Sequence, residues 1–383
     1  MLSTVKNLFG EFMNAMIKKL LQGQAVEWQA LGEVANLNRG RVMSKTYLAD
    51  NIGEYPVYSS QTANNGEIGK INTFDFEGEF ITWTTDGANA GTVFYRNEKF
   101  SITNVCGLIT LKYDYLTYKF LFYWLSIQAK KHVYSGMGNP KLMSNQMEKI
   151  QIPIPPLSVQ SQIVQILDTF TELNDQLTAE LSMRQKQYQY YRDFLLSEHE
   201  LAKVGFEWKT LGKLGIINRG KRVVKSQLTT EGVYPVYQNS LQPLGYFDKS
   251  NVKANTTFMI TAGAAGEIGY SNCAFWSADD CYYFDCPKDV LDDRFLYHSL
   301  KKQQNKIFSQ VRKASIPRLG RNSVENIKIP IPPLSVQSQI VAILDTFDTL
   351  TQSISEGLPK EIKLRQKQYE YYREQLLNFK ATI

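Results

Sequence analysis

The sequence predicts an α+β protein with approximate two-fold symmetry, in which two tandem mixed α/β domains are separated and joined by long antiparallel coiled-coil helices. Two observations predict this fold class. One segment of the chain occurs twice with the hydrophobic period of a helix, and the stretch before each copy alternates short apolar runs with turns rich in Gly, Asn and Asp. With 383 residues, the chain is long enough for two to four packed domains.

The first block of the repeated segment is almost identical in its two copies. Residues 152–170 read IPIPPLSVQSQIVQILDTF, and residues 329–347 differ from them only where Ala342 replaces Gln165. Shorter matches precede each copy. The elements Glu-Trp-x-x-Leu-Gly, Asn-Arg-Gly and Tyr-Pro-Val-Tyr each occur once in each half. The chain is therefore a tandem duplication with divergent domains and similar connecting segments.

The second block lies further along each copy and marks a difference in length. It reads RQKQYQYYRDFLL at residues 184–196 and RQKQYEYYREQLL at residues 365–377. The second copy carries four extra residues near residues 355–358, beside Gly357 and Pro359. A glycine followed by a proline is typical of a helix end and a new helix start, so we expect a kink or break there.

These boundaries divide the chain into five parts. We predict an N-terminal helix, a first variable domain, a central repeated helical spacer, a second variable domain and a C-terminal repeated helical spacer. They correspond to residues 1–24, 25–151, 152–203, 204–328 and 329–383. We further expect the N-terminal helix to pack near the C-terminal helix, at residues 369–380.

The repeated segments have the pattern of a coiled coil. After the extended proline-rich lead-in, Ser158 is placed to cap a helix. Apolar side chains then follow at alternating steps of three and four, namely Ile163, Ile166, Phe170, Leu173 and Leu177. Neither helix can bury this stripe alone, so we expect the two to pack antiparallel against each other.

Composition narrows the class of protein. The four cysteines contain no C-x-x-C pair, and we expect them to be reduced thiols in a cytoplasmic protein. No run approaches the roughly 20 apolar residues that a membrane span needs. A formal net charge of +6 suits a polyanionic partner. Motifs for nucleotide binding, methyl transfer or metal hydrolysis are missing from the sequence, so we expect no catalytic residue and no bound metal.

Polar and small residues at the ends of predicted strands fit contacts to DNA. Lys and Arg bind phosphates, Asn and Gln pair with adenine, and Gly lets the backbone approach a ligand. The candidates in the first domain are Arg39, Arg41, Ser59, Ser60, Gln61, Thr85, Asp86, Gly87, Asn89 and Lys141. Those in the second domain are Arg219, Lys221, Arg222, Gln238, Asn239, Ser240, Gly263, Ala264, Arg318 and Arg321. Taken singly, each is more often a solvated loop residue.

The two glycine-containing loops are predicted to be counterparts of one another. Residues 86–91, DGANAG, follow a predicted strand in the first domain, and residues 262–267, AGAAGE, follow one in the second. The alternative is that both are ordinary tight turns, since neither has the spacing of a dinucleotide or phosphate-binding loop.

The arrangement as a whole resembles a known family. Each domain opens with Glu-Trp-x-x-Leu-Gly, and it is followed by the proline-rich lead-in, the Gln-rich helix start and the helix end Lys-Gln-Tyr-x-Tyr-Tyr-Arg. In these features the whole chain resembles the specificity subunit of Type I restriction-modification enzymes. The resemblance implies two target recognition domains, each reading one half of a bipartite, asymmetric site in double-stranded DNA.

The same resemblance implies partners and the location of cofactors. The repeated helices would space the recognition domains and dock two modification subunits, which bind S-adenosylmethionine and methylate adenine. Two restriction subunits would join the complex and use ATP and magnesium. The chain itself would bind no cofactor and catalyse no reaction.

Two other classes of function remain open at this point. A scaffold protein with two β-rich ligand-binding domains on a coiled-coil rod would not retain DNA. A cryptic nuclease would cleave DNA with magnesium alone. Glu361, Ile362 and Lys363 have the Glu-x-Lys spacing of some metal nucleases, but they lie within the coiled-coil pattern, which favours a structural role.

Overall fold

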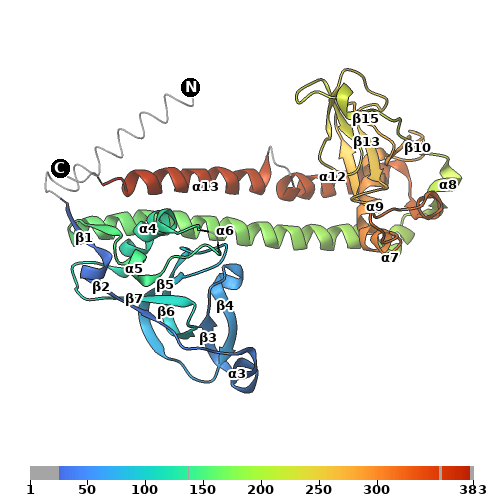
Figure 1. Ribbon diagram of the computed structural model, residues 1–383. Coiled ribbons are helices and arrows are strands. Elements are labelled where there is room, and N and C mark those ends of the chain that lie inside the picture. The colour runs from blue at the N-terminus through green and yellow to red at the C-terminus, as the bar shows by residue number, and fades with distance from the viewer. Residues whose placement is uncertain (1–25, 137, 353–355, 380–383) are drawn as a thin grey trace. The chain divides into compact units, whose positions relative to one another are not determined.

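The computed structural model describes residues 26–136, 138–352 and 356–379. The predicted N-terminal helix and its packing therefore lie outside the described residues. The chain divides into two compact units: unit 1 comprises residues 1–176 and 363–383, and unit 2 comprises residues 177–362. Each unit thus contains one variable domain together with parts of both repeated segments (Figure 1).

The variable domain of unit 1 is built on a six-stranded sheet. In spatial order its strands are β2 (Ala35–Arg39), β7 (Cys106–Leu111), β5 (Phe76–Thr84), β6 (Val93–Ile102), β3 (Ile52–Tyr58) and β4 (Glu67–Ile71). Neighbouring strands are antiparallel except for β3 and β6, which pair in parallel. Large side chains such as Trp83 and Phe100 are fully buried in the core.

The variable domain of unit 2 repeats this strand order. One sheet consists of β10 (Ile217–Arg219), β16 (Cys281–Phe284), β13 (Thr256–Ile260) and β14 (Ile268–Ser271). A second sheet consists of β15 (Trp276–Ser277), β11 (Tyr234–Tyr237) and β12 (Gly245–Phe247). Strands β14 and β15 together occupy the place of β6, and β15 pairs in parallel with β11 as β6 does with β3. The duplication seen weakly in the sequence is therefore clear in the backbone.

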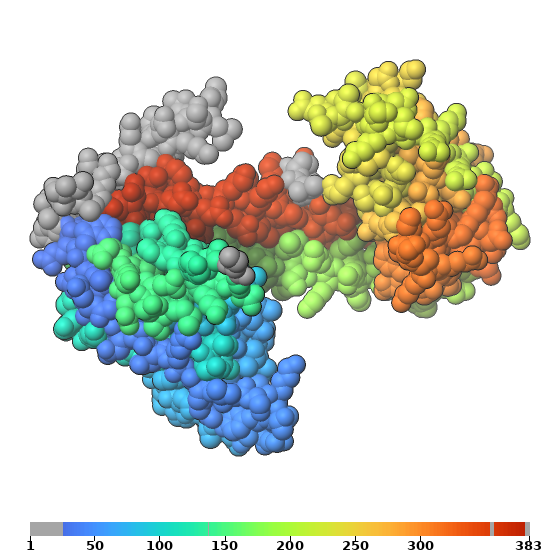
Figure 2. Space-filling view, in the orientation of Figure 1, coloured from blue at the N-terminus to red at the C-terminus, as the bar shows by residue number. Residues whose placement is uncertain are grey.

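Helices pack against these sheets, and Figure 2 draws the atoms of each domain in space-filling form. The longest helix of each domain is α4 (Tyr118–Gln128) in unit 1 and α9 (Asp293–Lys302) in unit 2. The shorter helices of unit 1 are α2 (Leu31–Val34), α3 (Lys45–Asp50), η1 (Ala63–Gly66), η2 (Ala129–His132) and α5 (Ser144–Met147). Those of unit 2 are α7 (Glu198–Ala202), α8 (Leu211–Leu214), η3 (Lys225–Gln227), α10 (Gln304–Phe308) and α11 (Arg321–Glu325).

A two-stranded ribbon joins the beginning and the end of each domain. In unit 1, β1 (Glu27–Ala30) pairs with β8 (Gln151–Ile154), and in unit 2, β9 (Glu207–Thr210) pairs with β17 (Lys328–Ile331). The predicted extended lead-in is therefore confirmed. Its prolines are tolerated because both strands of a two-stranded ribbon keep one unpaired edge.

The repeated segments form long helices. Helix α6 (Leu157–Leu195) is 39 residues long, and the second copy forms α12 (Leu334–Gln352) and α13 (Gly357–Leu376). The predicted break is confirmed, and Gly357 has a φ of +73°, which favours glycine. The prediction that Ser158 caps α6 is wrong, because the helix begins one residue earlier and the carbonyl of Pro156 accepts the first hydrogen bonds.

The start of each repeated segment packs against the end of the other. In unit 1 the Phe170 ring stacks on Tyr372 with centroids 5.1 Å apart, and in unit 2 the Phe347 ring stacks on Tyr191 at 5.3 Å. Phe170 and Phe347 are equivalent positions of the repeat, as are Tyr191 and Tyr372. Helix α6 runs from unit 1 into unit 2 and α13 runs back, so the predicted antiparallel arrangement is confirmed.

A buried glutamine attaches the first turn of each repeated helix to its variable domain. In unit 1 the Gln160 side chain donates to the carbonyls of Tyr115 and Pro155, at 2.8 and 2.9 Å, and accepts from the Thr117 amide at 2.9 Å. Its side chain is fully buried. Leaving buried polar groups of this kind without partners costs about 1–3 kcal/mol each.

Unit 2 repeats this attachment with different domain residues. The Gln337 side chain donates to the carbonyls of Val290 and Pro332, at 2.9 and 2.8 Å, and accepts from the Asp292 amide at 2.9 Å. Both glutamines therefore contact the domain mainly through backbone atoms, and the Thr117 hydroxyl adds one side-chain donor to Gln160 at 3.2 Å.

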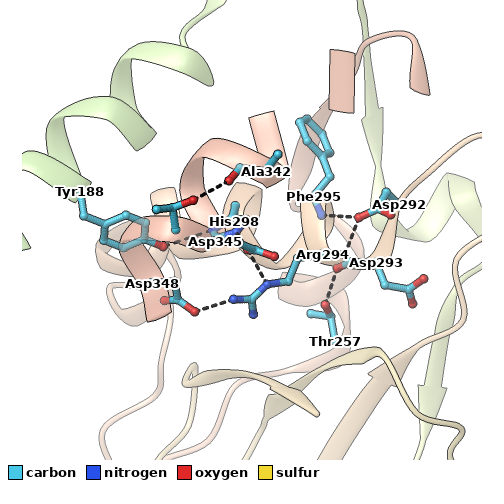
Figure 3. A network of polar contacts seen from close by, with 11 residues as sticks. Tyr188, Thr257, Asp292, Asp293, Arg294, Phe295, His298, Ala342, Asp345 and Asp348 are labelled. Atoms are coloured by element: carbon cyan, nitrogen blue, oxygen red, sulfur yellow. Dashed lines mark hydrogen bonds and ion pairs between the residues drawn. The ribbon is translucent and has the colours of Figure 1, made fainter. Parts of the chain in front are cut away.

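An aspartate about two turns further along the repeated helix anchors the domain helix. In unit 1, Lys119 and Tyr123 of α4 both bind Asp168. In unit 2, the equivalent Asp345 accepts from Arg294 and His298 of α9, each at 2.7 Å (Figure 3). The two domains use different residues at the same helical spacing, i and i+4, to bind the same repeated carboxylate.

His298 links three elements of unit 2 and is fully buried (Figure 3). Its Nε2 lies 2.7 Å from Asp345 Oδ1, and its Nδ1 lies 3.1 Å from the Tyr188 hydroxyl of α6. A neutral ring satisfies both contacts by donating to Asp345 and accepting from Tyr188. Burial lowers the pKa of His298 and outweighs the hydrogen bond that its ring donates to Asp345, which raises it.

This burial predicts a pH dependence of stability. An unfolded histidine has a pKa near 6.5, so the unfolded chain takes up a proton at a higher pH than His298 does in the fold. The stability that His298 contributes should be complete above about pH 6.5 and should fall as the pH drops through the lowered pKa. The titration of Asp345 should not obscure the effect of His298, because the hydrogen bond from His298 and the charge of Arg294 keep the pKa of Asp345 low despite burial.

Thermal unfolding between about pH 7 and 5 measures the effect. A His298→Gln variant should be less stable at pH 7 and show a flatter pH profile than the unmodified chain. His199→Gln is the matched control, because the side chain of His199 is 80% exposed and lies outside the buried network of Tyr188, His298 and Asp345. If the unfolding temperature of the His298→Gln variant changes with pH as steeply as that of the unmodified chain, this histidine is not the titrating group.

Candidate nucleic-acid interface

Several loops of unit 1 meet at one place, which we call the loop junction. It comprises residues 59–61, 85–91, 103–105 and 140–142 in unit 1 and their counterparts, residues 238–240, 261–266, 278–280 and 317–319, in unit 2. In unit 1 the first three loops follow strands β3, β5 and β6, and the fourth precedes helix α5. In unit 2 the fourth loop precedes helix α11. Most of the predicted DNA contacts lie in them.

Hydrogen bonds join the first two loops of unit 1. The Ser60 hydroxyl donates to the carbonyl of Asp86 at 2.8 Å, and the Thr103 hydroxyl donates to Ser59 at 2.8 Å. The fully buried Thr85 donates its hydroxyl to the carbonyl of Val105 at 2.8 Å. Ser59, Ser60 and Thr85 therefore hold the loops together.

The glycine loop of unit 1 is fixed through its backbone. The Gly87 amide donates to the carbonyl of Pro140 at 3.0 Å, and the Leu142 amide donates to the carbonyl of Thr85 at 2.8 Å. These bonds place Lys141 opposite Asp86, and Lys141 is exposed. Gly87 has a φ of +88°, a backbone conformation that favours glycine, which explains the residue type at this position.

The same backbone bonds recur in unit 2. The Gly263 amide donates to the carbonyl of Pro317 at 3.1 Å, and the Leu319 amide donates to the carbonyl of Thr261 at 2.8 Å. Arg318 is exposed and lies opposite Ala262, as Lys141 lies opposite Asp86 in unit 1. A basic side chain therefore holds the equivalent position in both domains.

The pairing of the two glycine loops differs by one residue from the sequence prediction. The amide of Gly91 donates to Thr84 and the amide of Gly266 donates to Ile260, so these two glycines are equivalent. The first loop is thus one residue longer, and Gly91 does not correspond to Glu267. The exposed Asn89, whose carbonyl accepts the Thr84 hydroxyl, lies in the longer loop.

The predicted arginines of the Asn-Arg-Gly elements lie beside the loop junction. Arg39 donates to the carbonyl of Asn104 at 3.4 Å, and Arg219 donates to the carbonyl of Asp279 at 3.2 Å. Arg41 pairs with Asp75 at 3.1 Å. The exposed guanidinium groups of Arg39 and Arg219 are thus held in equivalent places.

The glycines that follow these arginines have a steric cause. A Cβ atom added to Gly40 would lie 1.9 Å from the carbonyl oxygen of Ile102, and one added to Gly220 would lie 2.1 Å from that of Ala278. The backbone at each glycine therefore lies too close to the backbone of Ile102 or Ala278 for any side chain to fit. This explains why both Asn-Arg-Gly elements end in glycine.

The other predicted residues of unit 2 take varied roles. Asn239 accepts the Ala264 amide at 2.9 Å through its carbonyl, and Ser240 donates to the carbonyl of Gln242 at 3.0 Å. Gln238 is half-buried beside them. A Cβ atom added to Gly263 would lie 2.8 Å from the Asn239 carbonyl, so this loop also needs its glycine.

Four predicted residues differ in whether another group of the chain already binds their polar atoms. Lys221 and Arg222 have exposed side chains beyond β10, whereas Arg321 forms an ion pair with Glu325 at 2.7 Å. In unit 1 the Gln61 side-chain amide donates to the carbonyl of Glu67 at 2.6 Å. Arg321 and Gln61 would have to leave these partners in order to use the same groups for DNA.

Sequence reasoning missed one group of basic residues next to the loop junction. Lys130, Lys131 and His132 lie in η2 and are exposed. Lys130 packs against Gly91, because a Cβ atom added to Gly91 would lie 3.2 Å from the Cα of Lys130. The signal was an adjacent Lys-Lys-His run at the end of a predicted helix.

The chemistry of the described residues suits binding. In the part of the chain that the structure describes, no group of three or more His, Cys, Asp and Glu side chains could hold a metal ion. Burial raises the pKa of the Cys106 and Cys281 thiols to about 12, so neither supplies a thiolate nucleophile. Glu361 and Lys363 lie inside helix α13, as the coiled-coil pattern predicted.

Comparisons with known proteins identify the family. The family model described as "Type I restriction modification DNA specificity domain" matches residues 25–183 and 203–364. The chain belongs to this family. The two matches correspond to the two copies of the duplication, and each ends within a repeated helical segment.

Relatives of the specificity family match the chain over nearly its full length. A putative type I specificity subunit of Mycoplasma pneumoniae is 35% identical over 356 residues, which cover 91% of this chain and 96% of the relative. A putative type I restriction enzyme specificity subunit of Haemophilus influenzae is 35% identical over 395 residues, covering 95% and 98%.

A solved structure shares the fold. The crystal structure of the S subunit of a Type I restriction-modification system from M. genitalium superposes with a TM-score of 0.69 and 18% identity, covering 92% of this chain and 97% of that one. The predicted fold class is therefore confirmed. None of the helices in the described ranges is long and apolar enough to cross a membrane.

The geometry predicts unequal roles for Arg318 and Arg321. Replacing Arg318 by alanine should weaken binding to all DNA sequences alike and lower the slope of log affinity against log salt by about one unit, because one phosphate contact is lost. Arg321→Ala should have a smaller effect, since its guanidinium is already paired with Glu325.

Binding titrations at several salt concentrations measure both quantities. Lys186→Ala is the control, because Lys186 is exposed on α6 and carries the same charge. A loss of preference at one base position with an unchanged salt slope would mean that Arg318 contacts a base instead of phosphate.

Proposed function

We propose that this specificity subunit reads a bipartite, asymmetric site in double-stranded DNA, with each variable domain reading one half. The observation that carries the proposal is the loop junction. Equivalent backbone bonds hold Gly87 and Gly263, while the side chains around them differ between the domains. Equivalent supports with unlike side chains are what two readers of unlike sequences require.

The proposal assigns docking of two modification subunits to the repeated helices. Support comes from the two repeated blocks, which give the beginnings and the ends of α6 and of the α12–α13 pair nearly the same side chains. Helix α6 also exposes large apolar groups, since Met183, Tyr190 and Phe194 are 60%, 64% and 42% exposed. Exposed apolar groups on a helix are typical of a protein interface.

Catalysis and cofactors belong to the partners in this proposal. The modification subunits would hold S-adenosylmethionine, and two restriction subunits, joining through the complex, would use ATP and magnesium. The chain would supply recognition and no catalytic residue. We place the complex in the cytoplasm, in keeping with four free cysteines, three of which are buried.

Exchange of one variable domain tests the proposal. Residues 206–326 would be replaced by the corresponding domain of another specificity subunit, and adenine methylation would be mapped in cells that hold the modification subunit. Only one half-site should change, because the domain of unit 1 keeps its own loop junction and its own attachment through Gln160. A change in both half-sites would contradict independent reading.

A further inference from the structure

A cavity in unit 2 lies where the end of α6 meets α9, α10 and the end of α12. Its volume is about 550 Å³. Three cationic side chains line it, Arg192, Lys301 and Lys302, together with several side-chain amides. None of the described residues that line it is acidic.

The positive charge in this cavity is only partly compensated. Lys301 donates to the neutral Gln304 side chain at 3.1 Å, and Lys302 donates to the carbonyl of Leu196 at 2.6 Å. Burial lowers the pKa of both lysines and outweighs the nearby carboxylates, Asp348 and Glu267 for Lys301 and Asp193 for Lys302, which raise it. Arg192 is 15% exposed and pairs with Asp193 at 3.2 Å. Cations withdrawn from water in this way gain from an anionic ligand.

The repeat indicates that the fold does not require this charge. Helices α4 and α9 are equivalent, because each binds its repeated aspartate at the same spacing. In α4 the positions of the two lysines are held by Ser126 and Ile127. In the second copy of the repeat, Glu370 stands in place of Gln189, which lines the cavity, whereas Arg192 keeps its residue type as Arg373. Unit 2 alone thus combines two lysines with a neutral amide.

The cavity adjoins the loop junction of unit 2. The Gln304 side chain, which lines it, donates to the carbonyl of Gly266 at 2.6 Å. A ligand in the cavity would therefore lie next to the residue that closes the glycine loop.

We propose that this cavity binds a phosphate-bearing ligand through Arg192, Lys301 and Lys302. Guanidinium and ammonium groups donate charge-assisted hydrogen bonds to phosphate oxygens, and the amides supply neutral donors. The volume is within the range of pockets that hold small ligands, which favours phosphate groups of a nucleotide or of a short stretch of DNA backbone over an acidic helix. The phosphate site stands without the proposed function, whereas assigning the phosphate to DNA rests on it.

Lysine labelling of the full chain tests the site and separates the sources. Acetylation of Lys301 and Lys302 would be quantified by mass spectrometry without ligand, with sodium tripolyphosphate, with random-sequence duplex DNA at low salt, and with polyglutamate. Tripolyphosphate at ten times its Kd should reduce labelling of Lys301 by about tenfold. The exposed Lys306 of α10 does not line the cavity and should be labelled as before.

The arms lead to different conclusions. Protection by tripolyphosphate and by DNA supports a backbone phosphate, and protection by tripolyphosphate alone supports a free nucleotide and leaves DNA reading by the loops untouched. Protection by DNA alone would overturn the cavity site, because DNA bound at the neighbouring loop junction would cover the lysines without placing a phosphate in the cavity. Protection by polyglutamate alone would overturn the proposal in favour of an acidic protein segment, and no protection in any arm would overturn it outright.

Matched variants test the side chains. Arg192→Gln and Lys301→Gln should each weaken tripolyphosphate binding by about tenfold in calorimetric titrations, because each removes one charge-assisted contact. Lys306→Gln carries the same change of charge outside the cavity and should bind within twofold of the unmodified chain. Unchanged binding in both cavity variants would contradict the proposal, and the labelling of the unmodified chain decides the matter if a variant fails to fold.

Discussion

The buried carboxamide of Gln160 and Gln337 is the interaction on which each half of this molecule depends. It fixes the first turn of a repeated helix to three backbone groups of the lead-in and the variable domain. Because the partners are backbone atoms, the contact survives replacement of the domain side chains. Thr117 in one domain and Asp292 in the other supply the same amide.

The loop junction follows the same rule. Its supports are mainly backbone hydrogen bonds, so the side chains that could face DNA are free to differ between domains. Asp86 and Ala262 occupy equivalent places, as do Lys141 and Arg318. An invariant frame with variable contact residues is what allows one architecture to read two unlike DNA sequences.

Much of this architecture could be predicted from the sequence. The repeat and its heptad pattern predicted the antiparallel helices, and the glycine and proline at 357 and 359 predicted the break. The glycine loops were found as well. These features depend on local backbone preferences and on periodic apolar residues, which a single sequence displays directly.

Other features could not be predicted because they depend on contacts between distant segments. The burial of Gln160 arises only when α6 packs on the chain around Tyr115. The ion pair of Arg321 with Glu325 is local, but it could be foreseen only once the bounds of the short helix α11 were known. The alignment of Gly91 with Gly266 required the backbone bonds that close the two loops. The same reason applies to the cavity at Lys301, whose walls come from four helices.

The central claim is that specificity lies in the variable domains and that the repeated helices hold both domains in equivalent ways. The most direct test is a chain that carries the first domain twice, with residues 31–150 in place of residues 211–327, followed by mapping of adenine methylation. The claim predicts a symmetric site made of the first half-site and its inverted copy. Retention of the original asymmetric site would contradict it, because specificity would then lie outside the exchanged domain.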